Sequence, residues 1–167
     1  MSPSLPRLGA TAVPQHRTPG GAGILHLGLG NFHRAHQAVY TAAAMAADGG
    51  EWGIVGVASR SRGVVDAMRE QDLLYSVAEI SPGTTSVTVP GVHTDAFVAA
   101  EQPERVVSTI AQPGVRVVTL TVTGNGYSYS PATGHLDVAD PEIAADRRGE
   151  GPLTTIGQRA QSGRGHG

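Results

Sequence analysis

Short apolar runs along the chain alternate with longer segments in which apolar residues recur every three or four positions. The runs are typical of buried strands, and the longer segments are typical of helices with one apolar face. The pattern predicts strands at 24–27, 52–58, 73–80, 86–92 and 115–123, and helices at 34–47, 63–71 and 103–112. Strands that alternate with helices favour parallel pairing through right-handed crossovers. We therefore expect an α/β fold with a Rossmann-like, doubly wound and mostly parallel sheet.

One part of the pattern departs from this alternation. The predicted strands 73–80 and 86–92 follow each other without a helix and flank Ser81-Pro82-Gly83-Thr84. Pro followed by Gly is typical of a tight turn between strands. We therefore expect a β-hairpin insertion beside the parallel sheet.

The two ends of the chain lack a regular pattern. Residues 1–23 are rich in Pro, Gly, Ser and Ala, which predicts a poorly ordered amino-terminal arm. Residues 159–167 are rich in Gly, Arg and Gln and present no apolar face, which predicts an aberrant or disordered tail. Between them, residues 24–158 are expected to form one domain, with a further helix starting near Thr154.

The first predicted strand leads directly into a pair of glycines. Gly28-Leu29-Gly30 follows the strand, and an alanine-rich helical pattern begins at once, with Asn31 as the expected N-cap. In such a strand–turn–helix the first glycine permits a tight turn, and the second lets the backbone approach a pyrophosphate. His33 stands where the dinucleotide-binding pattern G-x-G-x-x-G usually has its third glycine. Taken alone, the pair therefore fits a dinucleotide site and an ordinary glycine turn equally well.

The residues that follow the turn narrow this interpretation. Residues 28–38 read GLGNFHRAHQA and resemble the signature of the mannitol dehydrogenase/fructuronate reductase family, the polyol-specific long-chain dehydrogenases. Similar stretches occur at 52–57, 69–75, 115–123, 126–127, 133–137, 141–143 and 154–157. The resemblance runs from about Leu5 to Gln158 and covers only the amino-terminal part of a family member. It implies that 24–158 is a dinucleotide-binding domain, incomplete relative to the family.

The resemblance also implies a reaction. Family members transfer a hydride reversibly between a secondary alcohol of a polyol or sugar acid and the nicotinamide of NAD or NADP. Mannitol with fructose and fructuronate with mannonate are the leading substrate pairs. A lysine of the second domain serves as the base in the family, but all 12 basic residues of this chain are arginines. We therefore expect a truncated cofactor-binding part that carries no catalytic residue and is inactive alone.

The expected cofactor-binding residues are Gly28, Gly30, Asn31, Phe32, His33, Arg34, Ala35 and Arg60. Phe32 fits contact with the dinucleotide or packing in the core. Arg34 lies in the first helical turn, where a cation opposes the helix dipole, and fits a pyrophosphate partner or a surface salt bridge. No acid follows the second strand before Asp66, so Arg60 and Arg62 fit the 2′-phosphate of NADP or a solvated loop. The choice between NAD and NADP stays open.

A further departure from the family lies after the last predicted strand. Family members commonly carry Glu where this chain has Gly124, whereas Gly126 and Tyr127 match. We expect the loop to keep its shape and to lose a contact near the substrate or the nicotinamide.

Two histidines near the glycine turn have a spacing that could allow a shared metal ion. His33 and His36 lie three positions apart, but the sequence places no third ligand and the family uses no metal. We therefore expect no metal site and predict structural hydrogen bonds near the turn. His26, inside a strand, is expected to be a hydrogen-bonded core residue. His93 and His135 are expected to lie in loops at the surface.

Composition narrows the class of protein further. A net charge of −2 indicates neither a nucleic-acid nor an anionic-membrane partner, and a count of 0 cysteines excludes disulfides. The sequence shows no signal peptide and no apolar run of membrane-spanning length, so we expect a cytoplasmic protein. Two alternatives to the dehydrogenase fragment are a stand-alone dinucleotide-binding or regulatory module and a different nucleotide enzyme, such as a methyltransferase. The family resemblance argues against the second of these.

Overall fold

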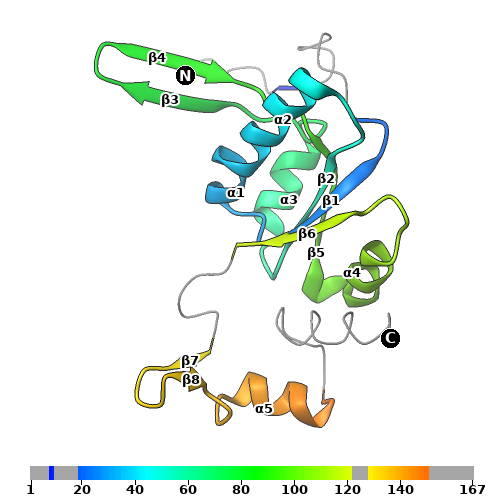
Figure 1. Cartoon of the computed structure of the whole chain (residues 1–167), viewed down its shortest axis with the longest axis vertical. Helices are drawn as coiled ribbons and strands as arrows, with labels where there is room; N and C mark the ends of the chain where they lie inside the picture. The colour runs from blue at the N-terminus through cyan, green and yellow to red at the C-terminus, as the bar shows by residue number, and fades with distance from the viewer. Residues whose placement is uncertain (1–7, 10–18, 122–127, 151–167) are drawn as a thin grey trace, which may run out of the picture.

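The centre of the molecule is a parallel sheet, seen in a computed structural model that describes residues 8–9, 19–121 and 128–150 (Figure 1). Its four strands are β1 (Ala22–Leu27), β2 (Gly53–Ala58), β5 (His93–Val98) and β6 (Val117–Leu120), in the order β5-β2-β1-β6. All neighbours in this sheet pair in parallel. Successive strands are added on one side of β1 as far as β5, and β6 then returns to the other side. This order confirms the predicted Rossmann-like, doubly wound fold.

Helices cover both faces of the sheet because side chains alternate between the faces along each strand. On one face, α2 (Gln37–Asp48) and α3 (Arg62–Arg69) pack on a core that includes Ile24, Ile54, Ala96, Ala38, Val65 and Met68. On the other face, α4 (Pro103–Ile110) contributes to a core of Leu25, Leu27, Val55, Val57, Phe97, Ala99 and Val106. A short 3₁₀ helix, η1 (Ala99–Glu101), links β5 to α4.

The first predicted helix differs from expectation at its start and in its middle. Helix α1 (Asn31–Ala35) is capped by Gly30 without a side-chain hydrogen bond, so the prediction of Asn31 as N-cap was wrong. The Asn31 side chain instead accepts a hydrogen bond from Arg34. The chain leaves helical geometry at His36, with φ −121° and ψ −76°, before α2 begins. Gly49, with φ 72°, caps the end of α2 at Asp48, one residue beyond the predicted end of the helix.

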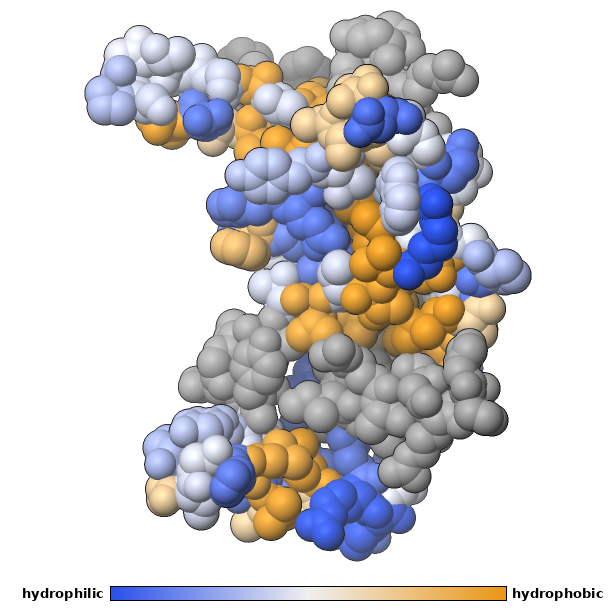
Figure 2. All heavy atoms as spheres, viewed as in Figure 1, coloured by the Kyte–Doolittle hydropathy of each residue, from blue (hydrophilic) through white to orange (hydrophobic). Residues whose placement is uncertain are grey.

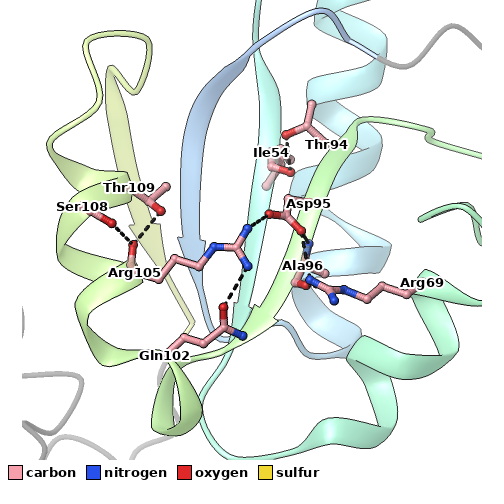
Figure 3. Close-up of polar contacts among 9 residues, drawn as sticks. All are labelled: Ile54, Arg69, Thr94, Asp95, Ala96, Gln102, Arg105, Ser108 and Thr109. Carbon is pink, nitrogen blue, oxygen red and sulfur yellow. Dashed lines mark hydrogen bonds and ion pairs between the residues drawn. The ribbon is translucent and has the colours of Figure 1, made fainter.

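Strand β5 was missed by the sequence analysis. Its first residues, His93, Thr94 and Asp95, are polar and obscure the apolar pattern of a buried strand. The structure supplies partners for them: Asp95 lies between Arg69 of α3 and Arg105 of α4 (Figure 3). His93 is buried and contacts His33, so its predicted surface position was wrong.

The predicted hairpin is present and stands apart from the parallel sheet (Figure 1). Strands β3 (Val77–Ser81) and β4 (Thr84–Thr88) pair antiparallel and leave Ile80 and Val87 exposed. A second hairpin, β7 (Tyr129–Ser130) and β8 (His135–Leu136), and α5 (Pro141–Arg148) were not predicted. Apolar side chains gather around β6 and α4 on the face shown in Figure 2. Val107 of α4 and Val117 and Val118 of β6 are exposed.

Several expectations lie outside the described residues. They are most of the amino-terminal arm, the loop at Gly124–Tyr127, the helix near Thr154 and the tail 159–167. Strand β1 begins at Ala22, within the segment expected to be the arm. Among the helices of the described ranges, none has the length and apolarity needed to cross a membrane.

Candidate functional site

The glycine turn after β1 is wedged between the ends of two neighbouring strands. Gly28 has φ +109°, a conformation that favours glycine, and an added Cβ would lie 2.4 Å from the Thr121 carbonyl oxygen that follows β6. On the other side, the Gly28 and Leu29 amides donate to the Val57 carbonyl of β2 at 2.8 and 3.1 Å. Backbone conformation and close approach therefore both require glycine at position 28.

The second glycine lies on the open side of the turn. Gly30 is exposed, and among the described residues an added Cβ would meet only the Gly28 carbonyl, at 3.8 Å. Within the described part of the chain, the amides of Asn31, Phe32 and His33 have no backbone hydrogen-bond partner. The turn also lies at the boundary between β1 and β6, where the order of the sheet reverses. Open α/β sheets bind ligands at this position, so the main chain of the turn is accessible where a ligand is expected.

Two side chains flank the turn on its solvent side. Phe32 is 63% exposed and stacks on His36, with ring centroids 4.5 Å apart, which excludes the predicted alternative of core packing. The Arg34 guanidinium donates to the Asn31 side chain and, at 3.4 Å, to the Gly30 carbonyl, and it lies over the Tyr75 ring. None of these partners is a carboxylate, so none of them neutralises the positive charge of Arg34 beside the turn.

His33 points away from the turn into the core. It is fully buried, stacks on His26 with ring centroids 3.6 Å apart, and places its Nε2 3.0 Å from the His93 Nε2. Burial lowers the pKa of His33 to about 4 and the pKa of His93 to about 3, and neighbouring histidines add to both shifts. Burial also lowers the pKa of His26. These three rings are therefore neutral near pH 7.

The predicted structural role of the histidines near the turn is confirmed. His26 is buried and hydrogen-bonded, and His36 has its Nδ1 3.0 Å from the Phe32 carbonyl. His33 and His36 share no partner among these contacts. Over the described ranges, no three His, Cys, Asp or Glu side chains are grouped so that they could hold a metal ion.

Arg60 follows β2 and is paired with an acid that the sequence did not suggest. Its guanidinium lies 2.6 Å from the Glu142 carboxylate of α5, and the two side chains are 77% and 57% exposed. Arg62 pairs with Glu101 at 2.5 Å. Exposed pairs of this kind contribute at most about 1 kcal/mol, so Arg60 can exchange its partner at little cost.

Sequence reasoning missed four residues that lie beside the three buried histidines. Gln37 and Thr119 hydrogen-bond to the histidines, and the Tyr75 hydroxyl donates to the Arg34 carbonyl at 3.1 Å. Gly56 of β2 leaves the space that the Leu29 and His93 side chains occupy. All four lie in stretches that resemble the family: Gln37 in 28–38, Gly56 in 52–57, Tyr75 in 69–75 and Thr119 in 115–123.

The strand order and the glycine turn define a domain of the Rossmann class. The chain belongs to the mannitol dehydrogenase family, because it matches the family model described as the mannitol dehydrogenase Rossmann domain over residues 22–156.

Relatives and solved structures agree with this assignment. The chain is 36% identical over 141 residues to the polyol:NADP oxidoreductase of Gluconobacter oxydans, covering 81% of this chain and 29% of the relative. It is 35% identical over 159 residues to the mannitol 2-dehydrogenase of Pyrenophora tritici-repentis, covering 93% and 28%. The Pseudomonas fluorescens mannitol 2-dehydrogenase, solved as a ternary complex with NAD and D-mannitol, superposes with a TM-score of 0.81 at 32% identity, covering 93% and 35%. The chain thus spans less than a third of the length of these two sequence relatives.

Proposed function

We propose that the chain binds NAD or NADP at Gly28–Ala35 and forms the cofactor-binding part of a polyol dehydrogenase. The observation that carries this proposal is the exposed glycine turn at the point where the order of the parallel sheet reverses. The names of the relatives support it, since they refer to NADP, to NAD and to mannitol.

The residues of the turn suit a pyrophosphate. Gly30 leaves room for the phosphates, the amides of 31–33 offer donors, and the Arg34 guanidinium supplies a positive charge beside them. The exposed Phe32 ring offers an apolar contact at the same edge. Bound nicotinamide would accept or donate the hydride, while these residues bind and orient the cofactor.

The substrate and the base are assigned to other parts of the protein. We propose a polyol or sugar acid as substrate, with mannitol/fructose and fructuronate/mannonate as the pairs to test first. Because this chain has no lysine, a lysine base would have to come from outside these 167 residues. The chain alone is therefore expected to bind cofactor and to show no turnover. A cytoplasmic location stays a prediction.

Titration of the purified chain with NADH and with NADPH, followed by cofactor fluorescence, tests the proposal. Gly30→Glu places a carboxylate in the open space beside the turn and should weaken binding by about tenfold or more through repulsion of the phosphates. Ala44→Glu adds the same charge on the exposed surface of α2 and should leave binding unchanged. The cofactor assignment is wrong if neither dinucleotide binds, and the location is wrong if both variants bind alike.

The choice between the two cofactors depends on Arg60. If the protein uses NADP, Arg60→Gln should weaken NADPH binding and leave NADH binding unchanged, because only NADPH carries the 2′-phosphate. Glu142→Gln should then strengthen NADPH binding, since it removes the present partner of Arg60. Equal affinities of all three proteins for NADPH would show that Arg60 takes no part in cofactor choice.

A further inference from the structure

The buried histidines connect the glycine turn to a chain of hydrogen bonds beneath it. His26 Nε2 lies 3.1 Å from the Gly28 carbonyl, and His26 Nδ1 lies 2.9 Å from the Thr119 hydroxyl of β6. The Gln37 side-chain amide donates to that hydroxyl at 2.9 Å, and its carbonyl lies 3.0 Å from His33 Nδ1. We call this series, Gln37–Thr119–His26–Gly28, the turn relay.

The groups at the two ends of the relay determine where each proton lies. His26 Nε2 faces two oxygens, the Gly28 carbonyl at 3.1 Å and the Thr121 hydroxyl at 3.2 Å. The carbonyl can only accept, so we assign the proton to Nε2, with the Thr121 hydroxyl as a second acceptor, and leave Nδ1 to accept from the Thr119 hydroxyl. Thr119 in turn accepts from the Gln37 amide at 2.9 Å, and its own proton goes to His26 rather than to the Gln37 carbonyl, which lies 3.2 Å away. The opposite orientation of the Gln37 amide would reverse these bonds and direct the unprotonated Nε2 of His26 at a carbonyl oxygen.

The same logic extends to the other two histidines. The Gln37 carbonyl accepts from His33 Nδ1, so His33 Nε2 is an acceptor and His93 Nε2 is the donor to it. His93 Nδ1 is then an unprotonated nitrogen, and it is buried without a hydrogen-bond partner among the described residues. The low pKa values of His33 and His93 are consistent with one neutral tautomer for each ring.

We propose that the turn relay holds the Gly28 carbonyl so that the glycine turn keeps the shape that admits a dinucleotide phosphate, which makes Thr119 and His26 positioning residues. The inference rests on the proposed function, because it concerns the same turn. The Gly28 carbonyl also accepts from the Gly30 amide at 2.6 Å, so its direction is linked to the position of Gly30.

Two stacked rings, of His26 and His33, occupy the place where the third glycine of the pattern usually lets the helix pack on the strand. In the usual fingerprint, that glycine lets the helix pack closely on the strand. Here His33 of α1 lies parallel to His26 of β1, with the ring planes 12° apart. Gly56 of β2 provides space nearby, since an added Cβ would lie 2.7 Å from Leu29 and 3.3 Å from His93. A ring stack therefore joins helix to strand where a glycine contact is usual.

Thr119→Val tests the inference, because it removes the hydroxyl and nearly preserves the shape of the side chain. Loss of the two part-buried hydrogen bonds that join Thr119 to His26 and to Gln37 should weaken NADH or NADPH binding by about fivefold. Thr119→Ser restores the hydroxyl and should bind within about twofold of the parent chain. Thr109→Val is the matched control: Thr109 is a buried threonine of α4, and its hydroxyl bonds to the Arg105 carbonyl (Figure 3). It should lower stability and leave affinity unchanged.

Nitrogen-15 NMR of the labelled chain gives a readout that does not depend on the cofactor. The parent chain should show His26 and His93 protonated on Nε2 and His33 protonated on Nδ1. The Gly28, Leu29 and Gly30 amide signals should shift in Thr119→Val and stay in place in Thr109→Val.

The outcomes separate the relay from the proposed function. If the parent chain binds and Thr119→Val binds equally well, the positioning role is wrong and the cofactor site stands. If the parent chain binds neither dinucleotide, the proposed function fails. In that case turn amide signals that do not respond to Thr119→Val, or a His33 proton on Nε2, overturn the relay as well.

Discussion

Lowering the pH from about 7 to about 5 should weaken the folded domain, because His33 and His93 are held neutral in its core. Both side chains are at most 2% exposed. Their pKa values lie near 4 and 3, against 6.5 for an ordinary histidine. Other groups around them, His26, Arg34 and Tyr75, include no carboxylate that would stabilise the protonated rings.

The sign and size of the effect follow from proton linkage. Between pH 6.5 and about 4 the unfolded chain binds more protons than the folded chain, so the free energy of unfolding decreases as the pH falls. The stabilising contribution is fully present above the unfolded pKa. At about pH 5 each histidine lowers the free energy of unfolding by about 2 kcal/mol, so the pair lowers it by about 4 kcal/mol. This is a large fraction of the total stability of a typical domain, which is about 5–15 kcal/mol.

Urea unfolding between about pH 5 and about pH 8, followed by the fluorescence of the single tryptophan, Trp52, measures this dependence. His93→Gln removes one titrating group and should reduce the loss between about pH 7 and about pH 5 from about 4 to about 2 kcal/mol. His135→Gln replaces a histidine on the exposed β7–β8 hairpin and should retain the full loss. The three proteins carry the same carboxylates, so differences between their stability curves come from the substituted histidine.

One result would refute the reasoning. If His93→Gln loses as much stability on acidification as the parent chain, His93 is not held neutral by burial. The His93 ring would then be accessible to protons in the folded state.

Three further substitutions test the fold around the site. Gly28→Ala should lower the free energy of unfolding by more than about 2 kcal/mol and abolish dinucleotide binding, because φ is +109° and the new Cβ would lie 2.4 Å from the Thr121 carbonyl oxygen. Urea unfolding measures the first effect and NADH titration the second. Leu25→Ala should cost about 2–5 kcal/mol in the same unfolding assay, since Leu25 is 0% exposed; a smaller loss would show that the core collapses around the gap. Asp95→Asn should cost about 1 kcal/mol, less at high salt, because it weakens half-exposed ion pairs to Arg69 and Arg105; a cost that salt does not change would argue against an ionic role.

The sequence by itself determined the α/β class, the hairpin and the glycine turn. Each depends on local information: the period of apolar residues, the preference of Pro-Gly for turns, and the conformational freedom of Gly28. The string at 28–38 also indicated the family, which the match over residues 22–156 confirmed.

Only the tertiary structure decided where the polar residues lie and which partners they contact. Strand β5 was hidden because its polar start, His93 to Asp95, acquires partners only after folding brings α1, α3 and α4 beside it. His93 was predicted at the surface because burial of an imidazole depends on a hydrogen-bond partner sixty residues away, His33. The relay likewise joins Gln37 to Thr119 across 82 positions. No local pattern encodes such pairs, since a buried polar group is stabilised by whichever partner the fold places beside it.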